Sequence, residues 1–443
     1  MSSRIKIIIL LIILTIFFYL FIREKLNDIE CNNNIIDKET KDVDFIENIN
    51  HQVLLNVGDV ICNYKIPGIL DGLASYLEKN NLIILVNHEL RRSKGDEYSV
   101  KINNNNQNQK IKGARISKLT FDLDTKKIID AELAYNKIIY SNNKGNKNLS
   151  RFCSSSIFNF SSQGGDLVYF CGEETMRESG RGFALDVESK TLYQVEAFGK
   201  HSFENIVFFP TNFYNKVVAI IGDDRRNVPL FLYIGNIDKG STDFLDRHGL
   251  KNGKLYGWIS EPNNWDEKGN RSGYFKEYTQ ENKNSFHKFK RIEDVAFYKS
   301  NNNNYELIFN STTGGKNGRI FHINIDLDSF DKNKINGTIT NIYDKLKNND
   351  INTITMPDNI CIDKDKNIYI QEDNYRSKIN KIWRLELNNE LNIKNIIKVA
   401  SLMKWGETSG IIEVSNYFNN NKKYFLFNTQ LVGGKGQLIL FWF

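Results

Sequence analysis

Acidic side chains recur where short apolar runs of this 443-residue chain end. Four runs end in this way: Glu89 in LIILVNHE, Glu173 and Glu174 in LVYFCGEE, Asp223 and Asp224 in VVAIIGDD, and Glu372 and Asp373 in IYIQED; a fifth pair, Glu293 and Asp294, lies within RIEDVAFY. A buried carboxylate needs a cation or hydrogen-bond donors, because removing its charge from water is costly. Converging carboxylates therefore predict a site for hard metals such as calcium, or for iron or manganese.

Each acidic pair taken alone also has a simpler interpretation. An Asp or Glu after a strand is commonly a turn residue. Asp223–Asp224 precedes Arg225–Arg226, which fits a local ion-pair turn, and Asp358–Asn359 fits an Asx-turn. Recurrence of the same arrangement after several runs favours the metal site.

The elements that carry these acids have the length and spacing of β-strands. From Val53 onward, apolar runs alternate with turn signals about every 10 residues, which is typical of a sandwich, barrel or propeller. The 29 Phe and 20 Tyr suit pleated, half-buried surfaces. Three strand–turn–strand segments, FDLDTKKIIDAEL, ALDVESKTLYQVEA and CIDKDKNIYIQED, are typical of propeller hairpins. We predict an all-β fold, a β-propeller over residues 51–443 that points the acids into its central channel; a single large sandwich is the alternative.

The N-terminus carries an apolar segment. The 16 residues IIILLIILTIFFYLFI, at 7–22, have basic residues on both sides. This length is short for a membrane span and long for a signal-peptide core, so residues 1–22 are predicted to be an uncleaved signal-anchor helix or a cleaved signal peptide, with a buried core helix as the remaining alternative. Residues 23–50 are predicted to be a polar tether. In either leading case the protein is exported, either anchored to a membrane or free in the periplasm, the exterior or a eukaryotic lumen.

Charge and cysteine content exclude several classes of protein. The 59 basic and 53 acidic residues give a net charge of +6 that is spread along the chain. Nucleic-acid binding is not expected, because there is no clustered basic stripe. The five cysteines are widely spaced, which excludes a disulfide scaffold and a paired-cysteine zinc motif. One or two disulfides remain possible in an oxidising compartment, with at least one thiol left over. We expect a monomer.

The order of motifs along the chain resembles that of PhoX-type alkaline phosphatases. The motifs, in chain order, are IPGILDGLA (66–74), LVNHEL (85–90), GARISKLTFD (113–122), FCSSS (152–156), GEE (172–174), GRGFALD (180–186), HSFENI (201–206), GDD (222–224), LFLYIG (230–235), GLKNGKLYG (249–257), RIEDVAF (291–297), GRIFHI (318–323), PDNICID (357–363), IYIQED (368–373), ETSGIIEVS (407–415) and FNTQ (427–430). The resemblance extends over about residues 55–430.

This resemblance implies a six-bladed propeller whose central iron and calcium ions serve the hydrolysis of phosphate monoesters. Carried over motif by motif, it implies that Glu89, Glu173, Glu204 and Glu293 are metal ligands. Asp223 and Glu372 are implied as supporting acids or calcium ligands. Cys153 falls where the family has an iron-ligating cysteine, since a thiolate suits iron better than calcium. A buried structural thiol or a disulfide partner is the alternative for Cys153.

Strand alternation suggests roles for the neighbours of two of these glutamates. Residues i and i+2 share a face of a strand, so Arg291 lies on the face of Glu293 and is predicted to hold the phosphate of the substrate. A salt bridge from Arg291 to Asp294 or another acid is the alternative. Asn87 shares a face with Glu89 and is predicted to contact the same site. His88 lies on the opposite face and is expected to be a packed or capping residue.

We therefore predict a metal-dependent phosphohydrolase that acts on a small phosphate ester, with Arg291 and Glu293 as catalytic residues. The segment FCSSSIF lacks the Gly-, Pro- and Trp-rich continuation of the bacterial phosphatases, so the fold is carried over more directly than the activity. A propeller esterase or lactonase with calcium and a non-catalytic, calcium-stabilised binding propeller are the alternatives. Arg291 discriminates between them, because a phosphate site needs a fixed cation and an ester site does not.

Overall fold

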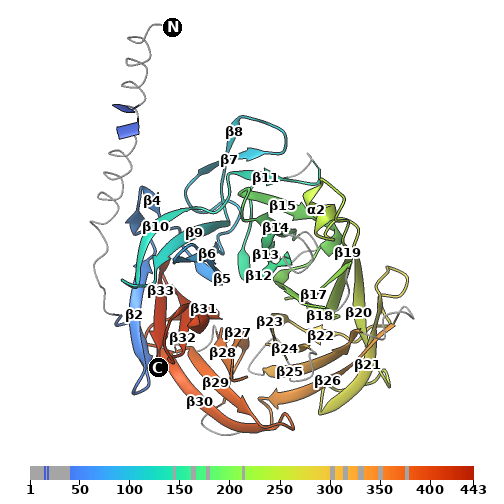
Figure 1. The fold of residues 1–443 in the computed structure, drawn as a ribbon. Helices are drawn as coiled ribbons and strands as arrows, with labels where there is room; N and C mark the ends of the chain where they lie inside the picture. The colour runs from blue at the N-terminus through green and yellow to red at the C-terminus, as the bar shows by residue number, and fades with distance from the viewer. Residues whose placement is uncertain are drawn as a thin grey trace.

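The fold is described from a computed structural model of the whole chain. The described residues are 14–15, 17–18, 40–142, 146–160, 166–175, 180–211, 215–299, 305–312, 318–327, 334–347, 353–374 and 379–443. Antiparallel sheets dominate them, and these sheets stand around a common centre (Figure 1).

Successive four-stranded groups follow one another around this centre. The first comprises β5 (Leu70–Glu78), β6 (Asn81–His88), β9 (Arg115–Asp122) and β10 (Lys127–Leu133). The second comprises β12 (Phe152–Asn159), β13 (Leu167–Glu173), β14 (Gly182–Asp186) and β15 (Thr191–Val195), and the third comprises β16 (Phe203–Phe209), β17 (Lys216–Asp223), β19 (Phe231–Asn236) and β20 (Lys254–Ser260). The fourth comprises β23 (Ile292–Lys299), β24 (Tyr305–Ser311), β25 (Arg319–Asp326) and β26 (Lys334–Asp344), and the fifth comprises β27 (Pro357–Ile362), β28 (Ile368–Glu372), β29 (Lys381–Leu387) and β30 (Ile393–Leu402).

The last group joins the two ends of the folded chain. It comprises β31 (Gly406–Glu413), β32 (Tyr424–Leu431), β33 (Lys435–Trp442) and the N-terminal strand β2 (Asn50–Asn56), which pairs with β33. One edge strand of each large group, β5, β12, β16, β23, β27 or β31, contacts the corresponding strand of the next group, and β31 contacts β5. These inner strands therefore form a closed ring, as in a propeller, and the single-sandwich alternative is wrong.

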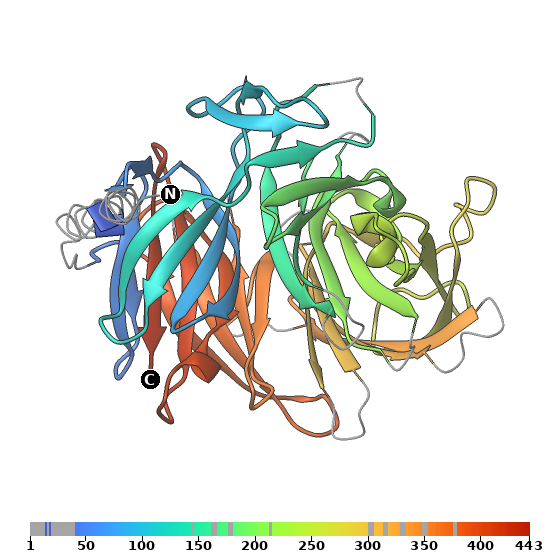
Figure 2. The ribbon, with the colours of Figure 1, turned by 45° about the horizontal axis from the view of Figure 1, so that its top comes forward.

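Shorter elements extend the sheets at their outer edges (Figure 2). β7 (Tyr98–Ile102), β8 (Asn108–Ile111) and β11 (Lys137–Ile139) extend the second sheet, where β11 runs parallel to β15. β21 (Asn270–Glu277) pairs with β20 and with β26, so it joins the third and fourth groups into one sheet. Further short elements in the described part of the chain are β1 (Val43–Phe45), β3 (Val60–Ile61), β4 (Tyr64–Lys65), β18 (Arg226–Val228), β22 (Phe289–Lys290), the one-turn helix α2 (Phe244–Arg247) and the 3-10 turns η2 (Glu196–Phe198) and η4 (Ser415–Tyr417).

The hydrophobic core is divided between neighbouring groups. Each of the large apolar clusters combines residues of two successive groups, as where Leu82 of β6 packs in one cluster with Leu426 of β32 and Leu438 of β33. Trp258 and Trp383 are fully buried in two other clusters. Alternation along each strand turns one apolar face toward each neighbour, which explains why strands buried on both faces are so rich in Phe, Tyr and Ile.

The folded part of the chain begins earlier than the sequence suggests. β1 (Val43–Phe45) lies within the predicted tether of residues 23–50, yet it pairs with β30 through Val43 and Leu402. The boundary at residue 51 is therefore corrected to residue 43 or before.

The predicted membrane segment lies almost entirely outside the described residues. Of residues 1–22, only 14, 15, 17 and 18 are described, and they are helical and exposed. Across the described part of the chain, no helix has both the length and the apolar character that a membrane crossing needs. The anchor or signal peptide stays a prediction.

His88 is packed inside the first group, as strand alternation predicts. Its Nδ1 lies 3.1 Å from the carbonyl oxygen of Gly68 and its Nε2 lies 2.7 Å from Oγ of Ser117. Burial lowers the pKa of His88 from 6.5 to about 3. The unfolded chain therefore takes up a proton below pH 6.5 that the folded chain does not, and folding stability falls as the pH falls.

This burial predicts a measurable acid sensitivity. Between pH 7.5 and pH 5 the His88 imidazole should cost the folded state about 2 kcal/mol, and His88→Gln should abolish that part of the loss. Urea unfolding of both proteins at the two pH values measures it, and other titrating groups cancel in the difference. Identical losses in the two proteins would contradict the prediction.

Candidate metal centre

A β-bulge near the start of five of the six inner strands turns one side chain toward the centre of the ring. In β5, two residues between Leu70 and Leu73 stand opposite the single residue between Val86 and His88 of β6. The same two-against-one register occurs in β12, β16, β23 and β27. The first bulge residues of these five strands are Asp71, Cys153, Glu204, Glu293 and Asp358. Bulges re-aim side chains in this way at functional sites.

A second set of acids comes from the neighbouring strands of the same groups. Each follows directly after the end of such a strand: Glu89 after β6, Glu174 after β13, Asp224 after β17 and Asp373 after β28. In the fourth group this position is Thr312, whose hydroxyl donates to Oε1 of Glu293 at 2.8 Å. The last group departs from the pattern and contributes Glu407 and Ser409 from β31.

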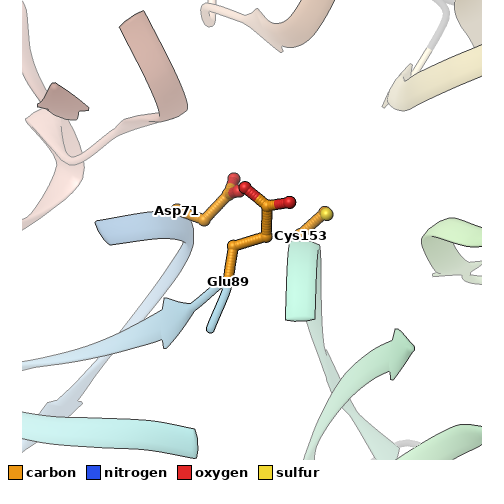
Figure 3. A group of neighbouring side chains, drawn as sticks. All are labelled: Asp71, Glu89 and Cys153. Atoms are coloured by element: carbon orange, nitrogen blue, oxygen red, sulfur yellow. The ribbon is translucent and has the colours of Figure 1, made fainter. Parts of the chain in front are cut away.

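These side chains line one cavity of about 60 Å³ at the centre of the ring, which we call the central pocket. Its described lining consists of nine carboxylates, one thiol, two arginines, Asn359 and Ser409: Asp71, Glu89, Glu174, Glu204, Asp224, Glu293, Asp358, Asp373, Glu407, Cys153, Arg151, Arg291, Asn359 and Ser409. Figure 3 shows Asp71 and Glu89 directed toward one another, with Cys153 beside them.

Three groups within this pocket have the spacing of metal ligands. Asp71, Glu89 and Cys153 form the first, Cys153, Glu174 and Glu204 the second, and Glu204, Glu293 and Asp358 the third, each with its ligand atoms within 4.8 Å of one another. Cys153 and Glu204 each belong to two groups. The groups therefore form a chain in which neighbouring sites share a ligand.

Two arginines supply part of the positive charge that the carboxylates need. Nε of Arg291 donates to Oδ1 of Asp224 at 2.6 Å and its Nη2 donates to Oδ2 at 2.9 Å. Nε of Arg151 donates to Oε1 of Glu89 at 2.5 Å, and its Nη2 is paired with Glu174. Two cations do not balance nine carboxylates.

The remaining imbalance raises the proton affinity of the pocket. Burial, and then neighbouring carboxylates, raise the pKa values of Asp71, Glu204, Glu293, Asp358 and Glu407 well above their usual range. Burial likewise raises the pKa of Glu174 to about 8 and that of the Cys153 thiol well above its usual value. A set of buried oxygen ligands and one thiol, short of positive charge, fits multivalent cations.

The backbone is strained where several inner strands begin. Ile69, Arg151, Arg291 and Met356 have φ values of 54°, 45°, 53° and 45°, and each lies two residues before a first bulge residue. A left-handed conformation is rare for a residue other than glycine and is a genuine outlier for β-branched Ile69. Such strain clusters at functional sites. Here the strained residues include both arginines of the pocket.

Five of the residues predicted from the sequence are brought together in the central pocket. They are Glu89, Cys153, Glu204, Arg291 and Glu293. Arg291 forms the salt bridge to another acid that was its alternative role, and its contact with a phosphate stays a prediction. Its partner is Asp224 and not Asp294, because Asp294 accepts hydrogen bonds from the side chain of Asn205 and from the backbone N–H of Ile360.

Three predicted ligands lie outside the pocket, and in each case the next residue lines it instead. Glu173, Asp223 and Glu372 are the last residues of β13, β17 and β28, so their side chains turn away from the centre. Their successors Glu174, Asp224 and Asp373 reach it. The assignments of Glu173, Asp223 and Glu372 as ligands are therefore corrected by one position.

Each displaced acid is held by partners within the fold. Glu173 accepts two hydrogen bonds of 2.7 Å from Arg181. Asp223 pairs with Arg225 and with Nδ1 of His201, which lies 2.7 Å away. Glu372 accepts hydrogen bonds from the backbone N–H of Thr355 and from Nε1 of Trp383.

Asn87 is a connection between groups and does not line the pocket. It stands opposite the bulge of β5, and its Nδ2 donates to the carbonyl oxygens of Cys153 and Ser154 in β12 at 2.8 and 3.1 Å. Asn310 donates to Asp358 O and Asn428 donates to Asp71 O in the same way. The predicted substrate contact of Asn87 is wrong because its amide fixes the bulge of the next inner strand.

Several residues of the pocket were not predicted from the sequence. Arg151 had a detectable signal, because it stands two residues before Cys153 just as Arg291 stands two residues before Glu293. Asp358 reads from sequence as a possible Asx-turn, yet it belongs to the third ligand group. Asp71 and Glu407 have no sequence signal of this kind, since their approach depends on how the first and last groups meet.

Glu174 lines the central pocket and its neighbour Glu173 does not, so substitutions of the two residues should have opposite effects on metal content and on stability. Glu173→Gln should leave metal content unchanged and lower unfolding stability by about 2 kcal/mol or more, because it breaks a buried charge pair with Arg181. Glu174→Gln should lower metal content and change the stability of the chelated protein less, because burial already raises the pKa of this carboxyl and the amide keeps the size of the side chain. Elemental analysis and urea unfolding of both variants measure this, and equal metal loss would contradict it.

Solved structures of other proteins have a fold similar to that of this chain. No protein-family profile matches the chain, and no curated protein matches it. Among solved structures, PhoX of Pseudomonas fluorescens in complex with vanadate, a transition state analogue, is similar with a TM-score of 0.64 and 11% identity, over 92% of this chain and 97% of that one. The soluble aldose sugar dehydrogenase of Escherichia coli has a TM-score of 0.42 and 9% identity, over 89% and 99%. The chain thus has a PhoX-like β-propeller fold, at a similarity that speaks for the fold alone.

Proposed function

We propose that this protein is a metal-dependent phosphohydrolase that cleaves phosphate monoesters at the central pocket. The observation that carries the proposal is the presence of Arg291 and Arg151 within a pocket of nine carboxylates. Carboxylates alone suit any cation-binding propeller, whereas fixed guanidinium groups beside cation sites suit a phosphate anion. The fold-level likeness to PhoX supports the same class of reaction.

The three ligand groups suit calcium and iron. Glu204, Glu293 and Asp358 offer oxygen atoms only, which suits calcium, while the two groups with Cys153 include a thiolate, which suits iron. Bound ions of this kind supply positive charge to the phosphoryl oxygens. Glu293 acts here as a ligand whose position is fixed by Thr312.

Arg291 holds the phosphate in this proposal. Its Nε and Nη2 are engaged by Asp224, and among the described residues nothing accepts a hydrogen bond from its Nη1. The side chain is 22% exposed, so Nη1 is available to a phosphate oxygen at the mouth of the pocket. In the reaction, a water oxygen bonds to phosphorus, the bond from phosphorus to the ester oxygen breaks, and the alcohol leaves with a proton.

The number of blades and the cellular compartment of the enzyme are part of the same proposal. We count the four-stranded groups as six blades, the last closed by β2. Cys62 forms a disulfide, while Cys153, Cys171 and Cys361 are free thiols. A disulfide is typical of an oxidising compartment, which supports export of the protein. A monomeric enzyme held at a membrane by residues 1–22, or released from it, fits this setting.

Phosphate release and metal content measured on one preparation test the function. Purified protein supplied with calcium and iron should release inorganic phosphate from 4-nitrophenyl phosphate, and EDTA should abolish the release until both metals are restored. Protein that binds neither metal, or that binds metal and releases no phosphate, would overturn the proposal. In the second case, turnover of an aryl ester or a lactone would identify a calcium-dependent esterase, and its absence a binding propeller.

A further inference from the structure

A second cavity opens beside the central pocket, where the last group meets the first. It has a volume of about 350 Å³, and we call it the rim pocket. Its lining comes from the segment before β5, the residues after β28, the segment before β31, and the ends of β32 and β33: Ile69, Asp373, Asn374, Asn380, Trp405, Gly406, Glu407, Gln430, Leu431, Val432, Gly434 and Lys435.

The two cavities are adjacent, because Asp373 and Glu407 line both. Glu407 and Gln430 stand opposite one another in β31 and β32, and Gln430 donates through Nε2 to Asp71 Oδ2 at 3.0 Å. Gln430 therefore reaches from the rim pocket to the first ligand group. For a molecule whose phosphate lay in the central pocket, the rim pocket would be the neighbouring space for its other end.

The rim pocket offers an apolar surface that is open to solvent. Trp405 is 55% exposed and Val432 is 70% exposed, although both have large apolar side chains. The backbone N–H of Val432 donates to Trp405 O at 3.2 Å, so the two loops that carry them are fixed to one another. Ile69 and Leu431 add further apolar lining.

The amide side chains of this pocket are already engaged within the fold. Asn380 donates through Nδ2 to Gly406 O at 2.7 Å and accepts from the backbone N–H of Asn374 at 2.9 Å. Gln430 is held by Asp71. These amides offer little to the hydroxyl groups of a sugar or glycerol, since their hydrogen bonds serve the fold. The carboxyls of Asp373 and Glu407 are shared with the central pocket. The lining that remains is chiefly the apolar group of Trp405, Val432, Ile69 and Leu431, with Lys435 as its one added charge, and it favours a flat apolar ligand that packs against an indole ring.

We infer that the rim pocket binds the alcohol part of the substrate, and that it selects phosphate monoesters of alcohols bearing an aromatic ring, with Trp405 as the specificity-determining residue. This inference deepens the proposed function and rests on it for the position of the phosphate. Ring packing against Trp405 should favour an aromatic ester about tenfold over an aliphatic one.

Two pairs of ligands test the inference and separate it from the reaction. Benzyl phosphate and ethyl phosphate both release a primary alcohol, so the ring is their main difference. Benzylphosphonate and ethylphosphonate carry the same contrast without a bond that can be hydrolysed. The metal-replete full-length protein should bind benzylphosphonate about tenfold more tightly by calorimetry, with a matching preference in KM for benzyl phosphate. Trp405→Ala should remove both preferences, and Trp405→Phe should retain most of them.

Leu77→Ala is the matched control, because Leu77 is a comparably exposed apolar side chain of β5 that lines neither pocket. It should preserve both preferences. Hydrolysis of both esters with no preference in the wild type, or with a preference that Trp405→Ala leaves intact, would overturn the rim pocket and leave the phosphohydrolase standing. Selective binding of benzylphosphonate that Trp405→Ala abolishes, without hydrolysis of either ester, would support the pocket and overturn the phosphohydrolase.

Discussion

Glu204→Gln is expected to empty two metal sites with one substitution and to lower phosphatase activity at least 100-fold. Glu204 belongs both to the group with Cys153 and Glu174 and to the group with Glu293 and Asp358. An amide keeps the size of the side chain and can still accept the hydrogen bond that Ser154 Oγ donates at 3.0 Å. It loses the negative charge that a calcium or iron ion needs. Losing positioned charge at a phosphoryl group costs on the order of 10²–10³ in rate.

The measurement is elemental analysis beside phosphate release, on wild type and variant prepared together. Glu306→Gln is the control, since Glu306 is a strand acid paired with His322 outside the central pocket. The control should keep its full metal content and activity. A Glu204→Gln protein that loses metal from one site only would show that the third group is independent of the second, and unchanged metal content would contradict the shared ligand altogether.

The ring of strands was predictable because its causes are local. Apolar runs with turns between them follow from the alternation of buried and exposed positions, and the acid at the end of each run is visible in the sequence. The exact residue that enters the pocket was not predictable in the same way. Whether Glu173 or Glu174 faces the centre depends on where β13 ends and on the bulge opposite it in β12, a feature of strand pairing that the sequence of one strand does not contain.

Asn87 is a second residue whose role could not be predicted from the sequence of its own strand. It stands opposite the bulge of β5, close to the strand end that carries Glu89. Its amide nevertheless donates hydrogen bonds to the carbonyl oxygens of Cys153 and Ser154, which belong to the next group. Contacts between groups far apart in the sequence decide which polar side chains remain for a ligand. The same holds for Glu407, which joins the pocket only because the last group closes on the first.

Arg291→Lys is expected to lower kcat/KM for phosphate monoesters about 100-fold while metal content stays at the wild-type level. Lysine keeps the positive charge that Asp224 needs, so no buried carboxylate is left without a cation. Its three donors sit on one nitrogen atom, so it cannot pair with both oxygens of Asp224 through two nitrogens while a third nitrogen in the same plane faces the substrate, as the guanidinium of Arg291 can. The effect should therefore fall on the substrate and not on the ions.

Arg225→Lys is the matched control for this substitution. Arg225 forms the equivalent paired hydrogen bonds with Asp223, the residue next to Asp224, but it does not line the central pocket. Steady-state kinetics and elemental analysis of both variants should give a large loss of kcat/KM for Arg291→Lys alone. Equal losses in both variants would assign Arg291 a purely structural role. Wild-type kinetics in Arg291→Lys would contradict the proposed contact between Arg291 and the phosphate. The pocket would then offer nothing beyond a cation-binding propeller, because the carboxylates and Cys153 explain metal binding without Arg291.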